Sequence, residues 1–351
     1  MTSIDAQPNP PNLINSEAEL DALLTRPGLK TIEAIGSVSS PLVILGAGGK
    51  MGPTLAVLAK RAALQAGRSL RVVAASRFSD VSTRKWLENE GVETHQTDVL
   101  EPDSLRELPD TDNVIYLVGL KFGTQDNPSL TWAVNTLAPA HAVARYPGAR
   151  IVALSTGNVY PLSPVTEGGS IETAPLTPLG EYANAAVARE RVFEYLSRKH
   201  RTPIVILRLN YAVELRYGVL FELARKVHDG IPIPLENGFF NCIWQGDANE
   251  LILRSLALAA SPPSVFNLTG TETLSVRSIA LALGEHLGRA PIFEGSTASD
   301  ALLSNASRLH KLLGNPTTPL NSFLRWTAHW VRIGGRALGK STKFEVRDGR
   351  Y

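Results

Sequence analysis

One short stretch strongly constrains the fold of this chain: residues 41–52 read PLVILGAGGKMG. A four-residue apolar run is followed at once by glycines, and a helical pattern then begins; the glycines are Gly46, Gly48, Gly49 and Gly52. In a strand–turn–helix context, glycines let the backbone approach a pyrophosphate, which then faces the free N–H groups and dipole of the helix. The stretch therefore predicts dinucleotide binding, since an ordinary turn would not need so many glycines.

Short apolar strands alternate with helical segments in the first half of the chain. Strands are expected at residues 42–45, 70–75, 113–118 and 151–154, with a short one ending at Asp98, and helices at 51–66 and 130–146. This alternation predicts an α/β fold with a Rossmann-type, doubly wound parallel sheet. The second half is less regular, with helices expected at 182–199, 220–227, 248–259 and 278–287.

We divide the chain into three parts. Residues 1–40 are expected to form a polar, disordered lead-in and a helical prefix that packs beside the first strand, in which Ser16 and Glu19 have the spacing of a capping box. Residues 41–205 are expected to be the dinucleotide-binding Rossmann domain. Residues 206–351 are expected to be a smaller C-terminal substrate-binding lobe, interleaved with the first domain and ending in a basic, solvated tail.

Composition excludes several classes of function. The net charge of +2 is too small to indicate nucleic-acid binding. The single cysteine, Cys242, excludes an internal disulfide, and the histidines show no metal-ligand spacing, so no metal is expected. No apolar run approaches the roughly 18–20 residues of a membrane span, and the first residues do not resemble a secretory signal. We therefore expect a cytoplasmic protein with no membrane or nucleic-acid partner.

The end of the second strand carries information about the cofactor. In a dinucleotide fold an acidic residue there binds a ribose 2′-hydroxyl, whereas an arginine suits a 2′-phosphate. Here the strand ends in Ser76-Arg77, and Lys50 adds a positive charge in the glycine loop. We therefore expect NADP in preference to NAD, although Arg77 could equally be a solvated loop residue. Asp98, at the end of the third strand, could accept a hydrogen bond from adenine or could simply close a turn.

A second set of polar residues follows the fifth strand. Ser155 and Thr156 lie at the carboxyl end of that strand, where ligands bind in such sheets, and Tyr182 opens a later helix. Hydroxyls and a phenol in one cleft can move a proton on or off a carbinol while a hydride moves to nicotinamide. A tyrosine of ordinary pKa near 10 needs a nearby cation to do this at pH 7.

Taken together, these features resemble the extended short-chain dehydrogenase/reductase superfamily, in its NAD-dependent epimerase/dehydratase branch. The resemblance covers about residues 41–315 and includes the GxxGxxG glycines, the pair Asp98-Val99, the helix asparagine Asn135 and the Ser155-Thr156 segment with Tyr182. It implies a homodimer through the helices that begin near Leu130 and Tyr182. The residues expected to bind the cofactor are Gly46, Gly48, Gly49, Lys50, Met51, Gly52, Ser76, Arg77, Asp98, Val99, Leu117, Val118, Gly119 and Asn135.

One position departs from the family pattern. The family has a lysine four residues after the tyrosine, and this chain has Ala186. Another cation could replace that lysine, the chemistry could be altered and slow, or the protein could bind a dinucleotide without catalysis. Lys121 is the best candidate cation, because Gly119-Leu120-Lys121 resembles a segment of UDP-galactose 4-epimerase that lies against the cofactor. Arg189 lies about 10 Å from Tyr182 along the helix, which is far for direct contact.

The sequence therefore predicts an NAD(P)-dependent oxidoreductase or epimerase that acts on a hydroxyl of a sugar or nucleotide sugar. Tyr182 is expected to transfer the proton, Thr156 and Ser155 to orient the substrate oxygen, and Lys121 to supply charge. The alternative is a non-catalytic dinucleotide-binding or sensing protein derived from such enzymes.

Overall fold

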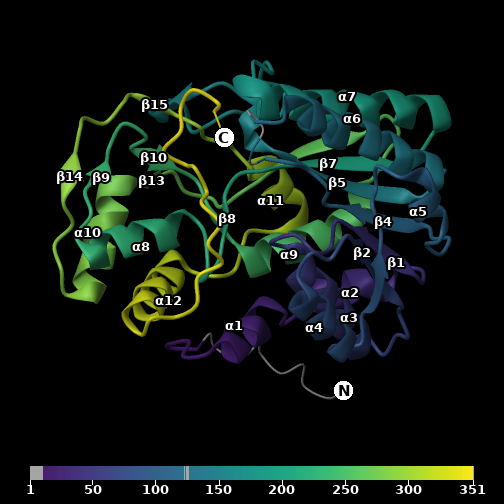
Figure 1. Ribbon diagram of the computed structural model, residues 1–351, viewed down its shortest axis with the longest axis horizontal. Helices are drawn as coiled ribbons and strands as arrows, with labels where there is room; N and C mark the ends of the chain where they lie inside the picture. The colour runs from purple at the N-terminus through teal and green to yellow at the C-terminus, as the bar shows by residue number, and fades with distance from the viewer. Residues whose placement is uncertain (1–10, 122, 124–125, 351) are drawn as a thin grey trace.

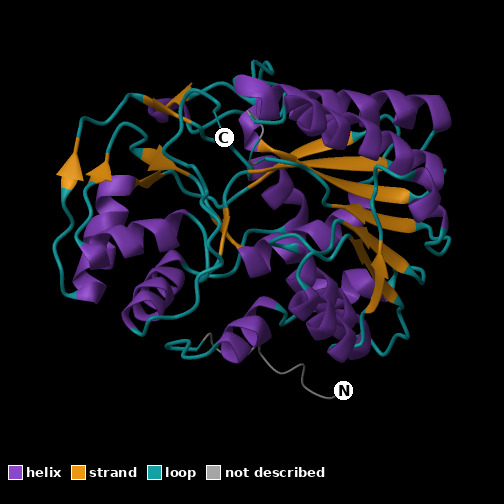
Figure 2. Cartoon of the chain, viewed as in Figure 1, coloured by secondary structure: helices purple, strands orange, loops and turns teal. Residues whose placement is uncertain are grey.

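The computed structural model describes residues 11–121, 123 and 126–350. Its centre is a seven-stranded parallel sheet with the order β12-β7-β5-β4-β1-β2-β3 (Figures 1 and 2). The chain order reverses at β1, which confirms the predicted doubly wound, Rossmann-type sheet. The strands are β1 (Leu42–Leu45), β2 (Val72–Ser76), β3 (Glu93–Gln96), β4 (Asn113–Tyr116), β5 (Arg150–Thr156), β7 (Ile204–Leu209) and β12 (Ser264–Leu268).

Helices cover both faces of the sheet, so its central strands are apolar on both sides. In β1, Leu42 and Ile44 pack into one core and Val43 and Leu45 into the other. The first core is shared with α2 (Leu29–Gly36), α3 (Gly52–Gln65), α4 (Val81–Asn89), α9 (Gln245–Arg254) and α11 (Ser307–Leu313). The second is shared with α5 (Pro102–Arg106), α6 (Pro128–Arg145) and α7 (Gly180–His200).

A third core lies in a smaller lobe beside the sheet (Figure 1). Its helices are α8 (Val219–Asp229), α10 (Val276–Leu287) and α12 (Leu320–Arg332). No helix was expected from the sequence at α12, although Phe323, Trp326 and Trp330 all lie on its buried face. The two-residue strands are β6 (Ser163–Pro164), β8 (Ala212–Val213), β9 (Ile233–Pro234), β10 (Phe239–Phe240), β11 (Ile243–Trp244), β13 (Leu274–Ser275), β14 (Phe293–Glu294) and β15 (Asp300–Ala301).

The helical prefix divides between two cores. The expected cap of α1 (Glu17–Leu24) is present, because Ser16 Oγ accepts a hydrogen bond from the Glu19 amide at 3.2 Å. Leu20 and Leu24 of α1 pack into the core of the smaller lobe, whereas Ile35 of α2 packs beneath the sheet. The expected position beside the first strand therefore holds for α2 and is wrong for α1. Residues 1–10 of the expected lead-in lie outside the described residues.

The segment after α12 runs back between the smaller lobe and the start of α7 (yellow in Figure 1). The Thr342 amide and hydroxyl both donate to the Glu222 carboxylate, and Phe344 is 1% exposed beside Phe240. Lys340 and Lys343 are exposed, as expected of a solvated basic tail. The tail is nevertheless docked on the fold. None of the helices in the described ranges is long and apolar enough to cross a membrane.

Candidate functional site

The glycine loop between β1 and α3 is shaped to admit a ligand. Gly46 has a φ of +83°, a conformation that side chains disfavour. A Cβ atom at Gly48 would lie 2.7 Å from Ser76 Oγ. No side chain caps the N-terminus of α3 within the described part of the chain, so the first N–H groups of the helix are left for a ligand. The loop thus provides a narrow cradle with donors for an anion.

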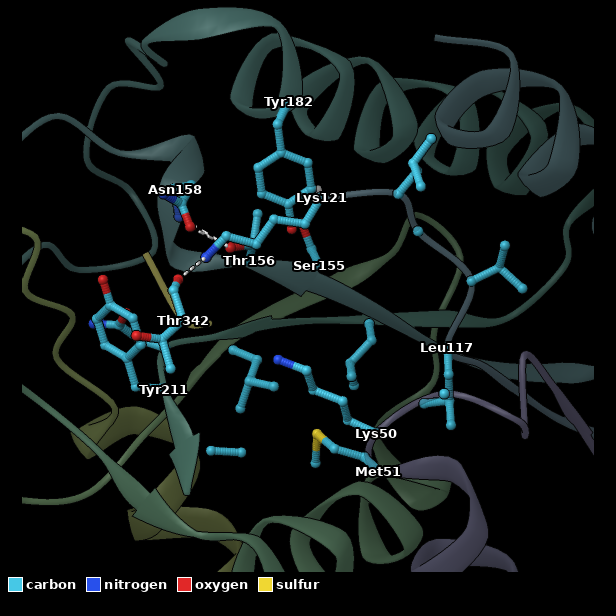
Figure 3. Close-up of a pocket in the computed structure, with 18 of the residues that line it drawn as sticks. Lys50, Met51, Leu117, Lys121, Ser155, Thr156, Asn158, Tyr182, Tyr211 and Thr342 are labelled. Carbon is cyan, nitrogen blue, oxygen red and sulfur yellow. Dashed lines mark hydrogen bonds between the residues drawn. The ribbon is translucent and has the colours of Figure 1, made fainter. Parts of the chain in front are cut away.

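A cavity of about 480 Å³ opens beside this loop (Figure 3). The glycine loop, the end of β4, the end of β5, the start of α7, the smaller lobe and the tail all contribute to its wall. Of the expected site residues it gathers Gly49, Lys50, Met51, Leu117, Val118, Gly119, Lys121, Ser155, Thr156 and Tyr182. Gly46, Gly48, Gly52, Ser76, Arg77, Asp98, Val99 and Asn135 are not among the residues that line it.

Tyr182 reaches the cavity from the first turns of α7, and only 7% of its surface is exposed (Figure 3). Ala186, one turn later, is fully buried against Val159 and Tyr160. Position 186 therefore forms part of an apolar cluster and offers no charge to the tyrosine.

The two hydroxyls at the end of β5 already use their protons. Ser155 Oγ donates to Glu190 Oε1 at 2.5 Å, and Thr156 Oγ1 donates to Asn158 Oδ1 at 2.9 Å. Thr156 Oγ1 also accepts from the Asn158 amide at 3.2 Å, as the cap of a short 3₁₀ turn. Because a hydroxyl oxygen has two lone pairs, both groups can still accept a hydrogen bond from a ligand in the cavity.

Two lysines reach the cavity from two different segments of the chain. Lys50 rises from the glycine loop, and its Nζ lies 4.6 Å from the centre of the Tyr217 ring (Figure 3). Lys121 follows β4 and donates from Nζ to the Thr342 carbonyl at 3.3 Å. Burial lowers the pKa of Lys121 to about 8, helped by the charge of Lys50. Burial, with the charge of Lys340, likewise lowers the pKa of Lys50 to about 8.

Arg189 lines the same cavity, although its Cα lies about 10 Å from that of Tyr182 along the helix. The length of an arginine and its tilt toward the helix N-terminus account for this. Arg189 Nη1 donates to Asn135 Oδ1 at 2.7 Å and to the Val118 carbonyl at 3.3 Å. Asn135 is thus placed behind the cavity wall, where it holds Arg189.

The residues expected on the adenosine side surround the ends of β2 and β3. Arg77 is exposed and follows Ser76 at the end of β2. Asp98 Oδ1 accepts from the Leu100 amide at 3.0 Å, which is the bond of a turn aspartate, and the Val99 carbonyl contacts His141 Nδ1 at 3.1 Å. Roles for these residues at adenine or its ribose stay predictions.

Sequence reasoning missed the contribution of the tail to the cavity. Thr342 and Lys340 line it, together with Tyr217 from the segment before α8. Nothing in the periodicity of residues 333–351 indicates this, because the tail is positioned by bonds to distant residues such as Glu222. Asn210 and Tyr211, which follow β7, also line the cavity.

The residues present fit a nicotinamide dinucleotide. The glycine cradle and the uncapped α3 suit its pyrophosphate. The cavity continues from the glycine loop to Tyr182, as a ligand with a reactive ring beyond the pyrophosphate requires.

Comparison with known proteins agrees with this geometry. A model of the NAD dependent epimerase/dehydratase family matches residues 42–238, which is more than half of the 351 residues. No curated protein matches the chain.

Solved structures of similar fold include a UDP-glucose 4-epimerase from Thermus thermophilus in complex with NAD, which is 19% identical, with a TM-score of 0.68 over 83% of this chain and 99% of that one. A UDP-glucuronic acid 4-epimerase from Bacillus cereus in complex with UDP-glucuronic acid and NAD is 18% identical, with a TM-score of 0.69 over 83% and 99%. A dTDP-glucose 4,6-dehydratase from Bacillus anthracis in complex with NAD is 15% identical, with a TM-score of 0.70 over 84% and 97%. At these identities the likeness concerns the fold. Because the family model spans the glycine loop, the Ser155-Thr156 segment and Tyr182, the chain belongs to the NAD-dependent epimerase/dehydratase family of enzymes.

Proposed function

We propose that this protein is an NAD(P)-dependent oxidoreductase of the epimerase or dehydratase type, acting on a hydroxyl of a sugar or nucleotide sugar. The observation that carries this proposal is the cavity, in which Tyr182, Ser155 and Thr156 meet residues of the glycine loop. Structures of similar fold contain NAD together with, in one case, a sugar nucleotide, which supports the choice of ligands.

The dinucleotide, when bound, would accept or return a hydride at its nicotinamide ring. The chain's own task is then to hold the substrate carbinol and to move its proton. Tyr182 is the group we assign to the proton, because α7 presents its phenol to the cavity beside Thr156 and Ser155.

Ser155 and Thr156 would orient the substrate as acceptors. Their hydroxyl protons are directed to Glu190 and Asn158, so the lone pairs that remain match a substrate O–H group. This arrangement favours the alcohol form of the substrate over a ketone, which has no proton to donate.

Lys121 would supply positive charge near Tyr182. Its pKa of about 8 keeps it mostly protonated at pH 7, and it lines the same cavity as Tyr182. A cation at that place stabilises a phenolate and so lowers the pKa of the phenol.

We assign the substrate to the side of the cavity formed by the smaller lobe. Tyr211 and Tyr217, from the segment between β7 and α8, and Lys340 and Thr342 of the tail form that side. Aromatic rings with hydrogen-bonding groups suit a sugar, and the lysines suit an attached phosphate or carboxylate. On this assignment residues 41–205 bind the cofactor and residues 206–351 select the substrate.

For the cofactor we propose NADP in preference to NAD, on the position of Arg77 alone. Arg77 is an exposed guanidinium directly after β2, where a 2′-phosphate would lie. Lys50 does not support this preference, because its Nζ lies over the Tyr217 ring and faces the cavity.

We further propose a homodimer through α6 and α7, which lie side by side on one face of the sheet (Figure 1). Their outer surface exposes Leu137 of α6, a large apolar side chain that a partner would cover. Light scattering should give the mass of two chains, and Leu137→Arg should give that of one. A monomeric wild-type protein would refute this part of the proposal.

The test of the function is Tyr182→Phe, assayed with a panel of UDP- and dTDP-sugars. The variant should lose turnover by about a hundredfold or more, because the proton-transfer group is gone, and should keep its affinity for NADPH or NADH. Tyr195→Phe, an exposed tyrosine on the same helix, is the matched control and should retain full turnover. Unchanged turnover in Tyr182→Phe would contradict the assignment.

A further inference from the structure

Arg189 is a buried cation that is not matched by a carboxylate. It is 3% exposed, and within the described residues it forms no ion pair; its two hydrogen bonds go to neutral oxygens of Asn135 and Val118. Burying a guanidinium is costly unless its charge and its N–H groups are compensated. The neighbouring oxygens therefore satisfy only part of this side chain.

The unsatisfied part can be located on the guanidinium. Both hydrogen bonds start from Nη1, so the Nη2 group and the Nε–H make no hydrogen bond to the described chain. A guanidinium has five N–H donors in one plane. Three of them are thus unused in a residue that lines the cavity.

The chain at the end of β4 is built around this guanidinium. A Cβ atom at Gly119 would lie 2.5 Å from Arg189 Nη1, so any residue other than glycine would displace it. On the other side Asn135, itself held by the Thr131 carbonyl at 2.8 Å, fixes Nη1. The group is therefore fixed in position while its remaining donors are unpaired.

The topology indicates which part of a dinucleotide would meet these donors. The pyrophosphate would lie at the glycine loop, and the adenosine half would extend over β2 and β3, on one side of β1. The other half must then extend over β4 and β5, where Val118, Gly119 and Arg189 lie. The oxygens available there are the hydroxyls of the second ribose.

We propose that Arg189 binds the nicotinamide ribose of the dinucleotide through its unused Nη2 group, since the Nε atom is buried. This inference rests on the proposed function, since it assumes that the dinucleotide occupies the cavity. It also accounts for the absence of the family's lysine at position 186. The positive charge near the nicotinamide ribose would come instead from Arg189, on the next turn of the same helix.

The experiment compares two ligands that share the adenosine and pyrophosphate groups. NADH contains the nicotinamide ribose and ADP does not. Titrations of wild type and Arg189→Met, by NADH fluorescence and by calorimetry for ADP, should show NADH binding weakened about tenfold or more and ADP binding unchanged. Arg189→Lys should recover part of the NADH affinity because it keeps the charge. Arg191→Met is the matched control, an exposed arginine of the same helix paired with Glu194, and should bind both ligands as wild type does.

Each other outcome counts against the inference in a distinguishable way. Equal losses for NADH and ADP in Arg189→Met would show that Arg189 only supports the fold, and would overturn it. NADH binding as tight as in wild type would overturn it while leaving the proposed function intact. Wild-type protein that binds neither ligand would overturn the proposed function itself.

Discussion

Arg208 and Glu190 form a buried ion pair beside the cavity, with Nη2 and Oε2 2.7 Å apart. Two further bonds from Arg208 Nε reach the same carboxylate, and Nη1 donates to Tyr160 Oη at 2.7 Å. Burial opposes the charge of Arg208, but its bonds to Glu190 outweigh this and raise its pKa. Because Ser155 also donates to Glu190, the pair fixes a residue of the cavity wall.

Arg208→Met should be strongly destabilising. It leaves the Glu190 carboxylate buried without its cation, which typically costs about 3–5 kcal/mol. Urea unfolding monitored by circular dichroism would measure this loss. The double variant Arg208→Met with Glu190→Leu should recover much of it, since the unpaired charge is then gone.

The exposed pair Arg71–Glu93 provides the control for this prediction. Its atoms approach to 2.8 Å, but both side chains are solvated. Arg71→Met should therefore cost less than about 1 kcal/mol. Similar losses for Arg208→Met and Arg71→Met would contradict the view that burial determines the effect.

The parts of the fold that follow local patterns could be predicted from the sequence. The glycine loop and the apolar run of β1 are local signals, and the structure places both as expected. Tyr182 and Thr156 could be picked out as candidates from the sequence, because Tyr182 lies at the start of a helix and Thr156 at the carboxyl end of a strand of the parallel sheet. Their convergence on one cavity follows from the topology rather than from any feature of the residues alone.

The remaining features depend on contacts between distant segments. The two-residue strands of the smaller lobe pair across long stretches of chain, as when Phe240 pairs with Leu274, and carry no periodicity. The place of Arg189 in the cavity wall was not predicted, because a helical rise gives only Cα positions, whereas its guanidinium reaches Asn135 on another helix. The docked tail likewise depends on Glu222, which lies more than a hundred residues earlier.

Cofactor preference can be tested at Arg77. If its guanidinium meets a 2′-phosphate, NADPH should bind more tightly than NADH, and Arg77→Ala should weaken NADPH about tenfold while leaving NADH unchanged. Arg84→Ala, an exposed arginine of the following helix paired with Glu88, should affect neither. Fluorescence titration of the three proteins with each cofactor provides the six affinities. Equal binding of both cofactors by the wild type would refute the role of Arg77.

The lysines of the cavity predict a gain of stability at alkaline pH. Lys50 and Lys121 have pKa values of about 8 in the folded protein, below the ordinary 10.5. Burial is the main cause, and the charge of Lys340 on Lys50 and of Lys50 on Lys121 adds to it; together these outweigh the attraction of Glu222 and Glu214. Between these pH values the unfolded chain binds more protons than the folded one, so the free energy of unfolding rises as pH increases through 8.

The expected rise between pH 7 and 9 is at most about 1.4 kcal/mol for each lysine. Urea titrations at several pH values would measure it, and the double variant Lys50→Met with Lys121→Met should lack it. Lys199→Met, at the exposed end of α7, should keep the wild-type slope. A falling stability over this range in the wild type, with no difference in the double variant, would show that the two lysines titrate normally.

The docked tail should be released by a single substitution. Phe344 is its buried anchor, 6.4 Å from the Phe240 ring, and the Asn237 side chain bonds to its carbonyl. Phe344→Ala removes most of the apolar area that holds the segment, a change that typically costs about 3–5 kcal/mol where the site cannot collapse. Because the tail lies at the surface, this loss should appear as local opening rather than as unfolding of the sheet. Trypsin should then cleave after Lys343 and Arg347 much faster than in wild type, while the midpoint of global unfolding changes little. Ile333→Ala, an exposed position just after α12, should leave the cleavage rate unchanged.

Since Thr342 lines the cavity, release of the tail should also raise the KM for the sugar substrate without changing NADH affinity. A tail that stays protected from trypsin in Phe344→Ala would show that its polar bonds, such as those to Glu222, suffice to hold it.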